Sequence, residues 1–241
     1  SSKKSKKKER KDRGVLREEA QTSAGGFAKF LQVLLGIFYP LVLLVGTLRL
    51  VASPLLLMIS YQRPGFPADE FGFTTADRLT YGSYGLDYLY NSADTRYLGE
   101  LELNGQPMFR AEEVSHMYDV KVLMVITMLS GLVLLILTVL MIWYLAQNYP
   151  GAVRRALFGG VIGLLVVLGA IAAAAIIGWE TFFTTFHEIF FSQGNWLFYR
   201  DDTLIRLYPG QFWVDAAVAI AVLTLAIMIV MMLVTAPTGR R

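Results

Sequence analysis

Residues 122–146 read Val-Leu-Met-Val-Ile-Thr-Met-Leu-Ser-Gly-Leu-Val-Leu-Leu-Ile-Leu-Thr-Val-Leu-Met-Ile-Trp-Tyr-Leu-Ala, without a charged side chain. A helix needs about 20 such residues to cross a bilayer. Residues 30–59, 156–178 and 214–235 are apolar over comparable lengths, and hydrophobic residues make up 55% of the chain. The sequence therefore predicts an all-α membrane protein built on a bundle of four transmembrane helices.

Basic residues predict how this bundle is oriented. The tail up to Lys29 carries ten lysines and arginines, and further arginines lie in the turn between the second and third spans and at the C-terminus. The two remaining loops, residues 60–120 and 179–213, contain six arginines and fourteen acidic residues. By the positive-inside rule, both termini are expected to be cytoplasmic and these two loops extracytoplasmic.

These patterns divide the chain into a simple series of segments. The basic tail is too polar to fold alone and is expected to be disordered, lying against anionic lipid. The net charge of +3 comes from this tail, so we expect no nucleic-acid partner. The predicted segments are a cytoplasmic tail (1–29), a first span (30–59), an outer loop domain (60–120), a second span (121–146), a cytoplasmic turn (147–155), a third span (156–178), an outer loop (179–213), a fourth span (214–235) and a C-terminal tail (236–241).

The first outer loop is long enough to form a small extracytoplasmic cap. Thr74 or Thr75 can cap a short helix, which Gly82 and Gly85 are expected to break or weaken. Residues 97–103 alternate as in a strand and are followed by Asn104-Gly105, which favours a tight hairpin turn. We therefore expect a cap of short helices with a possible β-hairpin.

The polar stretch Arg110-Ala-Glu-Glu-Val-Ser-His-Met-Tyr-Asp-Val-Lys121 leads directly into the second span and holds one of two histidines. If it is helical, residues three and four apart share a face, so Glu112, Glu113 and Asp119 can each approach His116. A histidine beside carboxylates is a candidate base. The alternative is a solvated helix start in which the acidic residues complement the helix dipole.

The second outer loop carries the other histidine, in Phe186-His-Glu-Ile-Phe-Phe191. Burial among phenylalanines would lower the pKa of His187 and keep the ring neutral, unless Glu188 offsets this effect. Because the second and third spans are consecutive and antiparallel, His116 and His187 are expected to reach the same face of the membrane. A site there suits chemistry on a lipid or a lipid-modified protein.

Other polar residues are candidates for supporting roles. Arg206, Arg49 and Tyr81 can donate hydrogen bonds to an oxyanion or position a substrate, in that order of preference. Arg49 is the one arginine within the spans, and it can either reach lipid phosphate or face the other helices. Two histidines and a carboxylate can also bind zinc, but the sequence has no His-Glu-x-x-His motif and no cysteine. We therefore predict neither a metal site nor a cofactor.

The two histidine motifs together resemble those of the bacterial four-span membrane family that includes the lipoprotein intramolecular transacylases (Lit). The resemblance rests on Glu113-Val-Ser-His-Met-Tyr-Asp-Val-Lys121, on Phe186-His-Glu-Ile-Phe-Phe-Ser-Gln-Gly-Asn-Trp-Leu-Phe198, and on Thr203-Leu-Ile-Arg-Leu-Tyr-Pro-Gly-Gln-Phe-Trp213. It covers nearly everything after the basic tail, and the long tail itself departs from the family pattern.

This resemblance implies a cofactor-free acyltransferase of the bacterial cell membrane. Such an enzyme moves an acyl chain from the diacylglyceryl group of a lipoprotein's N-terminal cysteine to that cysteine's α-amino group. His116 and His187 would be its catalytic residues, and its partners would be diacylated lipoprotein and membrane lipid. Two alternatives remain open from the residues: a non-enzymatic lipid- or protein-binding membrane component, and a metal-dependent hydrolase at the membrane interface.

Overall fold

Four long helices form the body of the protein. The computed structural model describes residues 2–191 and 194–236, with side chains from Gly25. Its long helices are α1 (Ser2–Val51), α5 (Ala111–Asn148), α6 (Ala152–Ile177) and α9 (Gly210–Thr235). Each contains a segment long and apolar enough to cross a membrane, which confirms the predicted all-α bundle.

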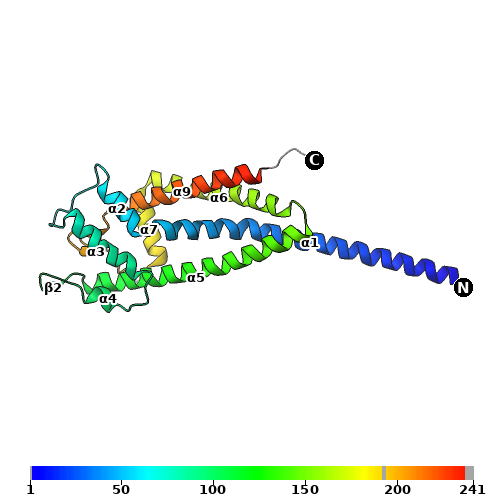
Figure 1. Ribbon diagram of the computed structural model, residues 1–241, viewed down its shortest axis with the longest axis horizontal. Helices are drawn as coiled ribbons and strands as arrows, with labels where there is room; N and C mark the ends of the chain where they lie inside the picture. The colour runs from blue at the N-terminus through cyan, green and yellow to red at the C-terminus, as the bar shows by residue number, and fades with distance from the viewer. Residues whose placement is uncertain (1, 192–193, 237–241) are drawn as a thin grey trace.

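Helix α1 is the centre of this bundle. It packs against α5, α6 and α9, whereas α5 and α6, although joined by a short turn, contact each other much less. Figure 1 shows α1 running between α5 and α6 along the length of the bundle. Helices α1 and α6 approach closely where the Gly36 carbonyl lies against Gly160. Small residues permit such close backbone contact in a membrane.

The basic segment differs from its expected conformation. Helix α1 begins at Ser2, so this segment continues the first span as helix rather than as the disordered tail that the composition suggested. Lysine, arginine, glutamate and alanine all favour helix, and extending an existing helix requires no new nucleation. Residues 237–241 of the predicted C-terminal tail lie outside the described residues.

The first span is shorter than predicted. Helix α1 ends at Val51, and a separate helix α2 (Pro54–Gln62) follows with Pro54 at its first position. Proline has no backbone N–H and fits the first turn of a helix, so it starts a new one here. The predicted span of residues 30–59 thus merges two helices.

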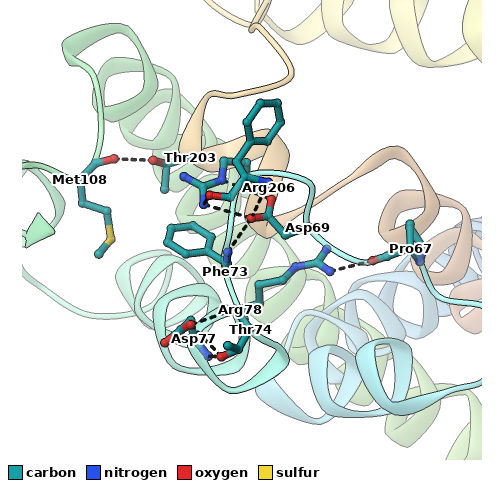
Figure 2. A network of polar contacts seen from close by, with 10 residues as sticks. Pro67, Asp69, Phe73, Thr74, Asp77, Arg78, Met108, Thr203 and Arg206 are labelled. Carbon is teal, nitrogen blue, oxygen red and sulfur yellow. Dashed lines mark hydrogen bonds and ion pairs between the residues drawn. The ribbon is translucent and has the colours of Figure 1, made fainter.

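The remaining elements between α2 and α5, together with α8 (Thr203–Leu207), form a cap over one end of the bundle (Figure 1). Helix α3 (Thr75–Tyr88) starts at a capping box in which Thr74 and Asp77 bond reciprocally, as Figure 2 shows. It continues through Gly82 and Gly85, so the predicted break was wrong. These glycines instead make room for neighbours: a Cβ at Gly82 would meet Leu57, and one at Gly85 would overlap Tyr208.

The hairpin is present but short. Strands β1 (Glu102–Leu103) and β2 (Gln106–Pro107) pair antiparallel around Asn104-Gly105. Both turn residues have positive φ, 54° and 73°, as a type I′ turn requires. The residues before β1 were expected to be strand, but Arg96–Gly99 form the short helix α4.

Two buried clusters hold the molecule together. One lies in the cap and the adjoining ends of the spans, where Tyr88, Leu57, Leu98 and Leu207 are fully buried. The other lies near the α5–α6 turn and includes Leu35, Leu145 and Val161. Much of the remaining surface of the long helices is apolar and exposed, as a lipid-facing surface would be. The remaining helix, α7 (Trp179–Phe190), follows α6 after Gly178.

Candidate active site

The structure brings the two histidines together. His116 lies in the second turn of α5 and His187 near the end of α7. Their ring centroids are 6.2 Å apart and their planes are inclined by 26°, in a stacked arrangement. Both side chains are buried, with 8% and 9% of their surface exposed. Residues that are 71 positions apart therefore share one site.

Aromatic side chains surround the pair. The rings of Phe191 and Phe198 meet His116 edge-on, at centroid distances of 4.8 and 5.4 Å. His187 lies against further rings, namely Phe183 at 4.1 Å, Trp196 at 4.9 Å and Phe186 at 5.5 Å. Phe183 and Phe186 belong to α7, like His187 itself. Phe183, four positions earlier, lies on the same side of the helix as His187, and Phe186 is its neighbour in sequence. The site is thus largely apolar.

His187 has a defined orientation and tautomer. Its Nδ1 lies 2.8 Å from the Phe183 carbonyl oxygen. A carbonyl can only accept a hydrogen bond, so Nδ1 donates and carries the hydrogen. In the neutral ring, Nε2 is then the free acceptor. Burial lowers the pKa of His187, and the bond to Phe183 only partly opposes that effect, so the ring is neutral at neutral pH.

The surroundings of His116 are different. Its Nδ1 is buried and has no hydrogen-bond partner among the residues that the structure describes. Asp119, one turn further along α5, interacts electrostatically with the His116 ring. One imidazole is therefore fixed by the backbone, and the other has a ring nitrogen without a partner among the described residues.

Glu113 has a different place from the one expected. It was predicted to orient His116, but both of its carboxylate oxygens bind backbone amides. Oε2 accepts from Arg110 at the start of α5, at 2.7 Å, and Oε1 accepts from Leu204 in α8, at 2.6 Å. With 1% of its surface exposed, Glu113 joins the cap to α5 one turn before His116.

Of the other two predicted carboxylates, Asp119 lies beside the site and Glu188 lies outside it. Asp119 accepts a hydrogen bond of 2.7 Å from Asn195 Nδ2, in the loop after α7. Glu188 is exposed on α7, and no hydrogen bond or ion pair of it is found within residues 2–191 and 194–236. Asn195 lies within the second histidine motif but was not predicted as a site residue, since its partner Asp119 is 76 positions away.

The three predicted donors lie in other contacts. Arg206 binds Asp69, with Nη2–Oδ2 3.0 Å and Nε–Oδ1 3.2 Å, and its guanidinium lies 3.6 Å from the centre of the Phe73 ring. Figure 2 shows this network, in which Thr203 also binds the Met108 carbonyl. Tyr81 packs on the same Phe73, and Arg49 lies over Tyr90 at 4.1 Å. None of these contacts joins a donor to either histidine.

Arg206 and Tyr81 instead share a separate cavity of the cap. This cavity has a volume of about 230 Å³ and is also lined by Asp77, Asn104 and Phe71. Burial raises the pKa of Asp69, but the Arg206 guanidinium and the Phe73 and Phe71 amides outweigh it, so the net shift is downward. Asp69 and Arg206 thus form a stable ion pair beside the cavity.

No described cluster has the composition of a metal site. Within the described ranges, no group of three or more histidine, cysteine, aspartate or glutamate side chains is arranged to hold a metal ion. The carboxylate that a two-histidine zinc site would need is therefore not in position in this part of the chain.

Comparison with known proteins identifies the family. The model of the family "Lipoprotein intramolecular transacylase Lit" matches residues 33–213, well over half of the chain. The chain belongs to the Lit family. The resemblance drawn from the two histidine motifs is thereby confirmed, and both motifs lie within the matched region. Family membership indicates a lipoprotein transacylase in the membrane.

Individual proteins and solved structures are similar to this chain over most of its length. An uncharacterised protein of Aquifex aeolicus (strain VF5) is 29% identical over 197 residues, which cover 81% of this chain and 88% of that protein. A structure of the membrane integral lipoprotein intramolecular transacylase Lit from Bacillus cereus matches with a TM-score of 0.70 and 20% identity, over 87% of this chain and 94% of that one. A histidine-to-alanine variant of that protein matches with a TM-score of 0.65 and 18% identity, over 90% and 95%. At these identities the structures establish the Lit fold of a multi-pass membrane protein.

Proposed function

We propose that this Lit-family protein moves an acyl chain from the diacylglyceryl group of a lipoprotein's N-terminal cysteine to the α-amino group of the same cysteine. The product is a lyso-form lipoprotein. The observation that carries the proposal is the pairing of the chain's two histidines, 6.2 Å apart in a buried aromatic site. Family membership supports the same reaction.

His187 is suited to act as the base. An α-amine has an ordinary pKa near 8, so at neutral pH it is mostly protonated and cannot attack an ester. His187 is neutral and is held by Phe183 with Nε2 as the free acceptor. Nε2 can therefore take a proton from the substrate ammonium, and the resulting amine can attack the ester carbonyl carbon.

His116 is suited to return a proton. The tetrahedral intermediate breaks down when the C–O bond to glycerol is cleaved, and the departing oxygen needs a proton. The attacking amine must also lose a second proton, and His116, beside His187, can take this proton and pass it to the departing oxygen. The sum of the steps is one N-acyl bond formed, one ester bond broken and one free glyceryl hydroxyl. Of the two protons that the ammonium loses, one ends on the glyceryl oxygen and the other is released from His187 to solvent.

The apolar walls favour transfer over hydrolysis. Water that reached the ester would compete with the amine, and the rings of Phe191, Phe198 and Trp196 restrict its access. Because nucleophile and ester belong to one molecule, holding them together supplies much of the rate, up to roughly 7–11 kcal/mol in ideal cases. Two histidines in a shaped apolar site are then a sufficient catalytic set.

The charge pattern supports a location at the outer face of the membrane. Four spans and a basic tail favour a cytoplasmic location for both termini, by the positive-inside rule. The histidines, which lie at the cap end of the bundle, would then face the extracytoplasmic side. Diacylated lipoprotein and membrane lipid are the partners, and the basic start of α1 would lie against anionic lipid.

Mass spectrometry of the N-terminal peptide of a reporter lipoprotein tests the proposal. With the wild-type protein, we expect an N-acylated lyso form that is lost in His116→Gln and His187→Gln, which keep side-chain size without a titratable ring. Glu188→Gln, an exposed change on α7 next to His187, is the matched control and should retain the product. Unchanged product with both histidine variants folded would refute the enzymatic proposal and favour a binding role.

A further inference from the structure

Asn195 connects the loop after α7 to the helix that carries His116. Its Nδ2 donates to Asp119 Oδ2 at 2.7 Å and lies 3.4 Å from Ser115 Oγ. Ser115 precedes His116 and Asp119 follows it by three residues, so Asn195 lies beside that turn of α5. The next residue, Trp196, packs on His187. Asn195 therefore lies between the surroundings of both histidines.

Two polar atoms of this site lack partners within the described ranges of the chain. Asn195 Oδ1 and His116 Nδ1 are both buried, and neither has a hydrogen-bond partner in the part of the chain that the structure describes. Buried polar groups are nearly always paired, so each exception requires an explanation. The Asn195 amide cannot simply be reversed, because Oδ1 would then face the Asp119 carboxylate, and two acceptors cannot bond to each other.

We infer that Asn195 is a positioning residue that receives the α-ammonium group of the lipidated cysteine on its free Oδ1. This inference rests on the proposed function. An ammonium has N–H donors only and needs acceptors around it, and Oδ1 is an acceptor that nothing in the described protein uses. Asp119 supplies a negative charge that favours the cationic amine.

The arrangement also explains why a neutral amide, rather than the carboxylate itself, meets the amine. A direct ion pair with Asp119 would stabilise the protonated amine and oppose its deprotonation. The bond from Nδ2 occupies Asp119 Oδ2 and presents an uncharged oxygen instead. Asn195 thus holds the ammonium in place while leaving its proton available to a histidine.

Binding of unreactive lipopeptides tests this role apart from turnover. The probes are two diether lipopeptides, which have no ester to transfer, one with a free α-amine and one with an N-acetylated amine. We expect wild-type protein to bind the free amine more tightly, and Asn195→Leu to lose most of that preference, about ten- to a hundredfold. Asn148→Leu, an exposed change at the other end of α5, is the control and should keep the preference.

A parallel conversion assay separates the possible outcomes. With diacylated lipopeptide, Asn195→Leu should lower conversion to the lyso form, and its melting temperature should remain near that of the wild type. If the wild type itself makes no lyso form, the proposed function fails, and this inference fails with it. If the wild type converts and Asn195→Leu keeps both conversion and the preference for the free amine, the role of Asn195 alone is overturned.

Should Asn195→Leu prove unstable, Asn195→Asp replaces it. The new carboxylate at position 195 would then lie beside that of Asp119. The two repel each other unless one is protonated, and this protonation occurs more readily at lower pH. We expect the conversion optimum of this variant to move to lower pH than in the wild type. An unchanged optimum would count against the role.

Discussion

Replacing Gly160 with alanine should push α1 and α6 apart. A Cβ at Gly160 would lie 2.5 Å from the Gly36 carbonyl oxygen, 3.1 Å from its Cα and 3.2 Å from its carbonyl carbon. Ordinary contact begins at about 3.4 Å, so the closest pair falls short by about 0.9 Å (3.4 − 2.5). Because all three neighbours are backbone atoms, no side chain can rotate to relieve the overlap. We expect a loss of about 1–3 kcal/mol in the free energy of unfolding, as in other overpacked cores.

Gly163→Ala is the matched control for this change. Gly163 lies on the same helix, one turn further along, and a Cβ there would have nothing within 4 Å. Both variants gain the same helix propensity from alanine, so the difference between them isolates the helix crossing. Reversible unfolding of purified protein in mixed micelles, followed by circular dichroism, gives both free energies. A difference of less than about 0.5 kcal/mol would refute the close crossing.

Three further predictions concern the site and its supports. The lowered pKa of His187 keeps its ring neutral at pH values where an ordinary histidine, with a pKa near 6.5, is protonated. The rate of conversion should therefore fall on the acid side with a midpoint below pH 6.5. A midpoint at or above pH 6.5 would contradict the assignment of His187 as the base. Glu113→Ala leaves the buried Leu204 amide and the partly buried Arg110 amide unpaired. It should cost about 1–3 kcal/mol for the Leu204 amide and less for the other, whereas the exposed Glu112→Ala should change the melting temperature little. Arg206→Leu removes the partner of Asp69, whose side chain is 2% exposed, and should destabilise the cap by on the order of 3 kcal/mol; a loss of turnover without any loss of stability would instead support the catalytic role first considered for Arg206.

Several features of this protein followed from local sequence alone. Length and hydropathy are properties of a single segment, and so the four spans were predictable, as was the cap at Thr74. The Asn104-Gly105 turn was predictable for the same reason, since it depends on the backbone freedom of two residues. The two histidines could also be chosen, because two spans joined by a short turn return their far ends to the same face of the membrane.

The contacts between distant segments were decided by the tertiary structure. The sequence around Glu113 does not show whether its carboxylate binds backbone amides or contacts His116, because its second partner, Leu204, lies 91 positions away. The pairing of Arg206 with Asp69 spans 137 positions, and that of Asn195 with Asp119 spans 76. From the sequence alone, Gly85 is expected to weaken its helix. In the fold, the missing side chain at Gly85 makes room for the Tyr208 ring. Sequence patterns indicate which local structure a segment can form by itself. Which polar groups of the cap and the bundle come into contact depends on how the two pack together.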